Sequence, residues 1–232
     1  MIRAMSHAQK LLNRPAALLL AAVSVAGMAI RFCMFLQTIG HFAHAVFAFF
    51  SYFTLLSNLI ATGSLLHAAT TRSERPASPM TASIEGAALV YLLIAGLVFE
   101  LLLKGQAPPG RASFIADLLL HMVMPVGYFL YWLLLAPPRN LPWKSVGLWL
   151  LFPLGYAITL LLIGQQTHSY PYTFLDAGNL GWPRTFVNIA VLTSAFAVLS
   201  AAIVWLDRNV KPDFAGGSID LIVINSASLL DI

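Results

Sequence analysis

The alternation of hydrophobic and polar positions divides the chain into long apolar runs separated by short, turn-rich connections. A helix needs about 20 apolar residues to cross the hydrocarbon core of a bilayer. No connection is long enough for a soluble domain, and no internal repeat is evident. We therefore predict an all-α, polytopic membrane protein built as a single bundle of six transmembrane helices. The six spans are expected at residues 15–36, 44–69, 83–103, 112–136, 145–164 and 185–206.

The composition supports this class. Hydrophobic residues make up 59% of the 232 residues and charged residues only 9%, whereas soluble domains carry about 25% charged residues. The mean hydropathy is +0.81. The single cysteine, Cys33, excludes an internal disulfide. The formal charge of +4 is not concentrated in a patch of the kind that binds nucleic acid, so no nucleic-acid partner is expected.

The distribution of Lys and Arg predicts the orientation, because basic residues are enriched in cytoplasmic segments. The terminal segments and every second connection carry Arg3, Lys10, Arg14, Arg72, Arg75, Arg139, Lys144, Arg208 and Lys211. The other connections carry Lys104, Arg111 and Arg184. We therefore expect cytoplasmic termini, with an N-terminal segment at 1–14, a transmembrane domain at 15–206 and a C-terminal tail at 207–232. The first span exceeds the apolar region of a signal peptide and is expected to be retained.

Ionisable residues within a span are costly and point to function. In the segment ADLLLHMVMP, Asp117 and His121 are four residues apart and share one face of a helix. A carboxylate beside an imidazole fixes its tautomer and stabilises the imidazolium, as a general base requires. Alternatively, Asp117 pairs with Arg31 to hold two spans together, and His121 hydrogen-bonds between helices.

Hydroxyl groups are concentrated in FFSYFTLLSNLIATG, inside the second predicted span. Thr54 and His121 are both expected roughly 12–17 Å below the outer surface, at a rise of 1.5 Å per residue. Thr54 is therefore a candidate nucleophile, and Asn58, one turn away, a candidate oxyanion donor. The alternatives are that Thr54 bonds to its own backbone and that Asn58 bridges two helices.

Other polar residues are predicted at the same end of the bundle. The loop SYPYTFLDAGNLGW is either an aromatic belt at the membrane interface or a lid over an outward-facing cavity. Supporting roles at the site are predicted for Ser57, Arg31, Glu100, Tyr170 and Asp176.

A zinc site is a further alternative. His41 and His44 could join His121 and Asp117 as ligands. A catalytic zinc needs rigidly held ligands, however, and His41 and His44 are expected on a loop. We expect no metal and no cofactor.

Three segments, SYFTLLSNL, ADLLLHMVMPVGYFLYWLL and YPYTFLDAGNLGW, together resemble a group of bacterial six-span integral membrane proteins. More distantly, they resemble the androgen-induced family of multi-pass membrane hydrolases, which cleave fatty acid esters of hydroxy fatty acids. The resemblance covers roughly residues 10–210. It implies a hydrolase of lipophilic acyl esters in a bacterial inner membrane, with membrane lipid and the ester as its partners and without a cofactor.

Residue by residue, the resemblance places the family's threonine nucleophile on Thr54, with one extra residue before Asn58. The family's histidine falls on His121, which precedes Pro125, although the animal enzymes have one more residue between the two. Asp117 stands where those enzymes have a second histidine. The resemblance thus implies attack by Thr54 on an ester carbonyl while His121 takes the proton.

Two other functions stay open. A small-solute or proton-coupled transporter or binding protein would use Asp117, His121 and Arg31 to line a path, although no inverted repeats are evident. A structural or assembly protein would tolerate the loss of Thr54 and His121. The oligomeric state is not determined by the sequence.

Overall fold

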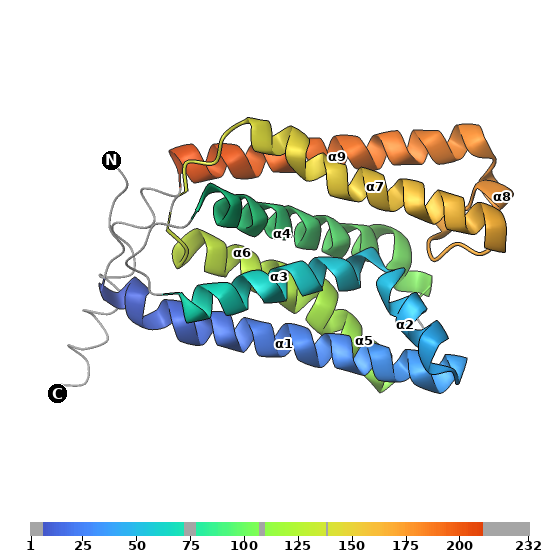
Figure 1. The fold of residues 1–232 in the computed structure, drawn as a ribbon, viewed down its shortest axis with the longest axis horizontal. Coiled ribbons are helices and arrows are strands. Elements are labelled where there is room, and N and C mark those ends of the chain that lie inside the picture. The colour runs from blue at the N-terminus through green and yellow to red at the C-terminus, as the bar shows by residue number, and fades with distance from the viewer. Residues whose placement is uncertain (1–6, 72–77, 107–109, 138, 211–232) are drawn as a thin grey trace.

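The computed structural model describes residues 7–71, 78–106, 110–137 and 139–210, and this part of the chain is helical without strands (Figure 1). The predicted N-terminal segment lies partly, and the tail beyond residue 210 wholly, outside the described residues. The elements are α1 (His7–Ile39), α2 (Phe42–Phe50), α3 (Phe53–Thr70), α4 (Pro79–Val98), η1 (Phe99–Leu103), η2 (Lys104–Gln106), α5 (Arg111–Leu118), η3 (Leu119–Val123), α6 (Met124–Leu134), α7 (Lys144–Thr167), η4 (Thr173–Leu175), α8 (Ala177–Leu180) and α9 (Trp182–Asn209).

The described helices form an all-α bundle of the polytopic membrane class, as predicted. Five segments are long and apolar enough to cross a membrane. If α2 and α3 together form one broken span, the number of spans is six. The five are Leu11–Ile39, Pro79–Gln106, Arg111–Leu134, Lys144–Thr167 and Trp182–Asn209.

The second predicted span, 44–69, is not a continuous helix. α2 and α3 meet at 79°, with the break at Ser51 and Tyr52. Tyr52 has an extended backbone, with φ −103° and ψ 121°, rather than a helical one. The Tyr156 hydroxyl donates to the Ser51 carbonyl over 2.7 Å, and the Tyr172 hydroxyl accepts the Phe53 N–H over 2.9 Å. These side chains satisfy the backbone groups that the break frees, as a membrane interior requires.

α4 is the central helix of the bundle (Figure 1). In the most apolar part of the segment Pro79–Gln106, which α4 begins, 61% of the residues are buried, compared with 22–33% in the other four long apolar segments. It packs against α3, α6 and α9, while α1 packs against α3 and α5, and α7 against α9. Small residues allow this close packing: a Cβ atom at Gly86 would lie 2.5 Å from the Trp149 ring. The core of the bundle therefore forms around α4.

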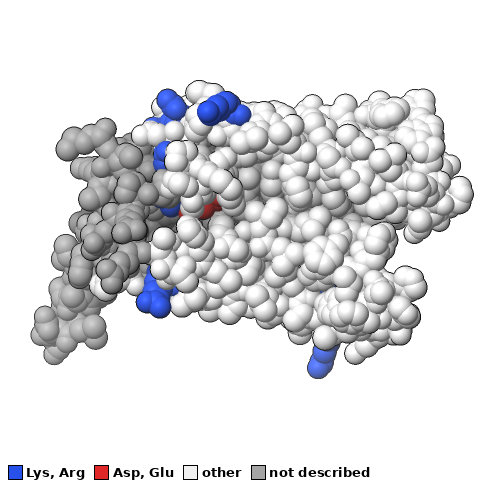
Figure 2. Space-filling model, viewed as in Figure 1, with Lys and Arg blue, Asp and Glu red and all other residues white. Residues whose placement is uncertain are grey.

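Charged groups gather at the end of the bundle where α1 begins and α9 ends. On the face shown in Figure 2, most of the visible Lys and Arg lie near this end. Glu85 accepts two hydrogen bonds from Arg139, over 3.1 and 3.2 Å, and Asp207 accepts the N–H groups of Arg139 and Leu141. These bonds anchor the connection between α6 and α7. The orientation prediction also used basic side chains that lie outside the described part of the chain: those of Arg3, Lys10, Arg72, Arg75 and Lys211.

Candidate active site

The break between α2 and α3 determines where Thr54 lies. The sequence placed Thr54 about three turns into a continuous span, but the structure places it in the first turn of α3. Its Oγ1 atom is 3.1 Å from Nε2 of His121, a residue 67 positions away in the chain. Both side chains are largely buried, with 8% of Thr54 and 9% of the His121 side chain exposed.

Two π-helical turns, η1 and η3, flank the site and position His121. His121 lies in η3, and Phe99, the first residue of η1, stacks on its ring with centroids 3.8 Å apart and planes at 10°. Pro125 has no N–H to donate to the His121 carbonyl, which favours the wider turn. That carbonyl packs against Gly96, where a Cβ atom would lie only 2.6 Å from it. The imidazole is therefore held by packing on both its ring and its backbone.

The hydrogen bonds of His121 assign its tautomer. Nδ1 is 3.3 Å from the Asp117 carbonyl oxygen and 3.6 Å from Asp117 Oδ1. Both of these groups accept hydrogen bonds, so the Nδ1 position carries the proton. Nε2 is then free to accept the Thr54 hydroxyl proton. This is the tautomer that a general base for Thr54 needs.

Asp117 has both of the contacts that the sequence left as alternatives. It forms an ion pair with Arg31 of α1, and it lies beside His121 one turn further along its own segment. Ser113 also donates to its Oδ2 over 3.3 Å. The Arg31 and Asp117 side chains are 13% and 11% exposed. The pair thus links α1 to α5 and borders the imidazole at once.

We expect Arg31→Met to destabilise the protein, because it leaves the largely buried Asp117 carboxylate without its cation. Removing one partner of such a pair lowers the free energy of unfolding by about 3 kcal/mol or more. The double variant Arg31→Met/Asp117→Asn should lose less than the single variant. Thermal unfolding of the purified protein in detergent measures both.

Lys104→Met is the matched control, because it breaks the exposed Lys104–Glu100 pair, whose side chains are 64% and 37% exposed. It should cost less than about 1 kcal/mol. An unchanged melting temperature in Arg31→Met would contradict a helix-linking role for the pair.

Two cavities meet at Thr54. The first has a volume of about 210 Å³ and a mixed lining, in which Arg31, Asp117, His121 and Gln106 add polar groups to apolar side chains such as Phe35, Leu55 and Leu120. The second lies between α4, α7 and α9 and is lined almost wholly by apolar side chains such as Ile94, Leu154, Ile189 and Phe196. Thr54, Leu103 and Tyr172 line both. Thr54 therefore lies between a cavity that contains charged and polar groups and one that is almost wholly apolar.

Asn58 and Ser57 do not line either cavity. The Asn58 amide donates to the Thr54 carbonyl over 2.8 Å, and its oxygen accepts from Ser24 over 3.2 Å. The Ser57 hydroxyl donates to the Phe53 carbonyl over 2.7 Å. Both side chains are fully buried. The structure therefore does not place the Asn58 amide where it could donate to an oxyanion; the residue holds the first turns of α3 against α1.

Glu100, Tyr170 and Asp176 lie apart from Thr54 and His121. Glu100 points outward and pairs with Lys104 over 2.6 Å. Tyr170 and Asp176 line a separate cavity near α8, where Asp176 caps the helix by accepting the Asn179 N–H over 3.1 Å. The sequence predicted these three residues at the site because they are expected at the same end of the bundle. The direction in which each side chain points depends on the packing, which the sequence does not show.

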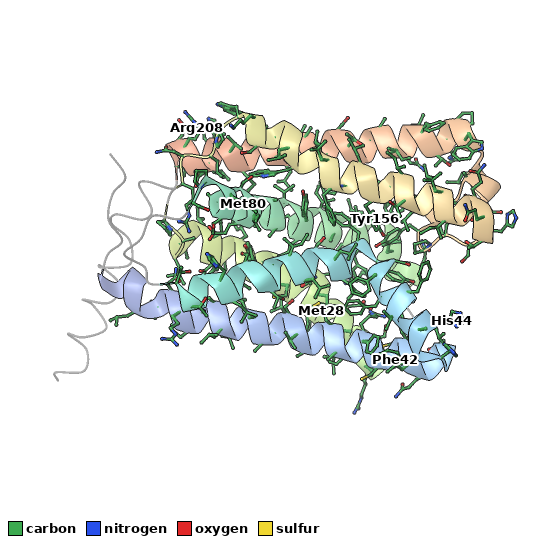
Figure 3. All side chains as sticks on the ribbon, in the orientation of Figure 1. Met28, Phe42, His44, Met80, Tyr156 and Arg208 are labelled. Atoms are coloured by element: carbon green, nitrogen blue, oxygen red, sulfur yellow. The ribbon has the colours of Figure 1, made fainter. Side chains whose placement is uncertain are left out.

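The histidines considered for zinc are also separate. The rings of His41 and His44 are 4.7 Å apart, and Figure 3 shows His44 near the α1–α2 turn, at the far end of the molecule. Within the described residues, no group of three or more His, Cys, Asp or Glu side chains is arranged to hold a metal ion.

No family model, curated protein or solved structure matches this chain. The resemblance to the androgen-induced family therefore rests on the short motifs alone.

Two residues at the site were missed by the sequence analysis. Phe99 stacks on His121, and Tyr172 lines both cavities and bonds to the start of α3. Tyr172 belongs to the motif YPYTF, in which the sequence analysis predicts a site role for Tyr170 instead. Nothing in the sequence distinguishes these two tyrosines, because only the turn of the loop decides which one faces inward.

Proposed function

We propose that this protein is an intramembrane hydrolase of lipophilic acyl esters, with Thr54 as nucleophile and His121 as general base. The observation that carries the proposal is the 3.1 Å contact between Thr54 Oγ1 and His121 Nε2 at the meeting point of the two cavities. A nucleophile in hydrogen-bonding reach of a base that a third group orients is the arrangement of covalent hydrolases. Here that third group is Asp117, through its carbonyl and its carboxylate.

The reaction has two halves. Thr54 Oγ1 bonds to the ester carbonyl carbon while its proton passes to His121 Nε2, and the carbonyl electron pair moves onto oxygen. The tetrahedral intermediate then breaks the bond to the alcohol oxygen, which takes the proton from His121. A water molecule attacks the resulting acyl-threonine and gives a proton to His121. The bond between Thr54 Oγ1 and the acyl carbon then breaks, Oγ1 takes the proton back from His121, and the carboxylic acid leaves.

The two cavities suit the two parts of such a substrate. The apolar cavity between α4, α7 and α9 has a volume of about 70 Å³ and suits the acyl carbons next to the carbonyl, because its lining excludes water from them. The alcohol part and the attacking water fit the polar cavity, beside Arg31 and Gln106. The carbonyl carbon would then lie at Thr54, which borders both.

The membrane setting of the proposal follows from the positive-inside pattern. We propose a bacterial inner membrane with both ends of the chain in the cytoplasm, so that the Thr54–His121 site opens toward the outer side. The lipophilic ester would reach the site from the membrane, and water from the outer surface.

The first test of the proposal is covalent labelling. We expect an alkyl fluorophosphonate to add once to the detergent-purified protein, with loss of fluoride, and intact-mass and peptide analysis to locate the adduct on Thr54. A long-chain probe should react faster than a methyl probe, because its chain occupies the apolar cavity. The absence of any adduct, under conditions that label a known serine hydrolase, would contradict the proposal.

A proton-coupled or small-solute transporter is the second candidate, because Arg31, Asp117 and His121 line one cavity. Met28, Leu55 and Leu120 form a buried apolar cluster beside that cavity, and Figure 3 shows Met28 near the middle of the bundle. A polar path through the bundle would have to open this cluster. Uptake into proteoliposomes without any covalent adduct would favour the transporter.

A further inference from the structure

Attack on an ester creates an oxyanion beside Thr54, and this charge needs a hydrogen-bond donor. Asn58 does not supply one, because its amide donates to the Thr54 carbonyl on the buried side of α3. A donor has to line the cavity where the substrate lies and must come within reach of the first turn of α3. The side chain of Tyr172 meets both conditions.

Tyr172 reaches the site from the connection between α7 and α9. It is 5% exposed, and its hydroxyl accepts the Phe53 N–H over 2.9 Å. The backbone of Thr54 also lies beside this hydroxyl. The phenol oxygen therefore lies at the N-terminus of α3, next to the backbone of the proposed nucleophile, and its ring lines both cavities.

A phenol can accept two hydrogen bonds and still donate one. Tyr172 accepts from the end of a helix, whose partial positive charge polarises its O–H bond. Burial raises the pKa of Tyr172 to about 12, so the hydroxyl keeps its proton near neutral pH. Its neighbour Tyr156 donates its own proton to the Ser51 carbonyl over 2.7 Å, and the Tyr156 hydroxyl is also in hydrogen-bonding contact with that of Tyr172. In the resting site the Tyr172 proton therefore goes to the neutral Tyr156 oxygen. A developing oxyanion is a stronger acceptor and can draw this proton toward the cavity.

We propose that Tyr172 is a catalytic residue whose hydroxyl donates a hydrogen bond to the oxyanion formed when Thr54 attacks the ester. This inference rests on the hydrolase function proposed above. It also gives the YPYTF loop a role in the chemistry that neither a lid nor an aromatic belt would provide.

The test compares an aryl ester with its thionoester, in which sulfur replaces the carbonyl oxygen. Sulfur accepts hydrogen bonds poorly, so loss of an oxyanion donor affects the ester far more than the thionoester. We expect Tyr172→Phe to lower kcat/KM for the ester about 100-fold and to bring the ester-to-thionoester ratio close to that of uncatalysed hydrolysis. Tyr172→Phe retains the ring, including its stacking on Phe174.

Tyr91→Phe is the matched control, because it removes another buried phenol, whose hydroxyl donates to the Trp149 carbonyl over 2.8 Å and which lines neither cavity at Thr54. It should leave the ester-to-thionoester ratio of the wild type unchanged. If Tyr172→Phe slowed both substrates equally, Tyr172 would be only a structural support of α3, and the inference would be overturned. A wild type that hydrolyses neither substrate and takes no fluorophosphonate adduct would overturn the hydrolase proposal itself, and this inference with it.

A second variant covers the case in which Tyr172→Phe does not fold. Placing 3,5-difluorotyrosine at position 172 keeps the shape and contacts of the side chain but makes the phenol far more acidic. An oxyanion donor must be protonated, so ester hydrolysis by this variant should fall as the pH rises above neutrality, whereas the wild type should show no such loss. Identical pH profiles for the two proteins would overturn the inference.

Discussion

Thr54→Ala is expected to lower kcat/KM for hydrolysis of a fatty acyl ester by roughly 10⁴-fold or more, because it removes the atom that forms the covalent intermediate. The melting temperature should change little, because Thr54 borders two cavities and the substitution removes the hydrogen-bond partner of His121 only. Steady-state hydrolysis in detergent micelles, beside thermal unfolding of the same samples, measures both effects.

Two variants control for this result. Thr54→Ser keeps a hydroxyl and should retain measurable activity. Ser57→Ala removes a buried hydroxyl one turn further along α3, whose hydrogen bond goes to the Phe53 carbonyl, and it should leave activity close to wild type. If Thr54→Ala and Ser57→Ala lost the same amount of activity, the loss would reflect a general disturbance of α3. That result would count against Thr54 as the nucleophile.

The second large effect is expected for His121→Ala, which removes the general base. Base catalysis contributes typically 10²- to 10⁴-fold, so we expect a loss of about 10³-fold in kcat/KM. The substitution also leaves a space beside the Phe99 ring, which stacks on His121 in the wild type. Added imidazole should enter this space and restore part of the activity, as measured by the rate against imidazole concentration.

Rescue by imidazole separates a chemical role from a structural one. His67→Ala is the matched control, since His67 is exposed on α3 and lines a different cavity; it should keep full activity and gain nothing from imidazole. Full activity in His121→Ala would contradict the proposed mechanism. A loss of activity that imidazole does not reverse, together with a lower melting temperature, would reassign His121 to packing.

The sequence by itself determined the fold class. Long apolar runs cannot satisfy their backbone groups in a bilayer except as helices, so the all-α bundle and every predicted span but 44–69, which is broken, follow from length and hydropathy. The four-residue spacing of Asp117 and His121 also determined their common face, because it is a property of one helical segment. Such features depend only on local chain geometry.

The site required the tertiary structure. No Pro or Gly marks the break at Ser51 and Tyr52; it is held by hydroxyl groups of Tyr156 and Tyr172, which lie more than 100 residues away in the chain. The sequence could not tell whether Asp117 pairs with Arg31 or lies beside His121, and packing allows both. The sequence pointed to Asn58 as the oxyanion donor and to Tyr170 as a supporting residue, and it missed Tyr172. Helical spacing and membership of a motif do not reveal which polar group already has a buried hydrogen-bond partner. The bundle decides this, since each polar side chain in it must turn toward a partner or a cavity.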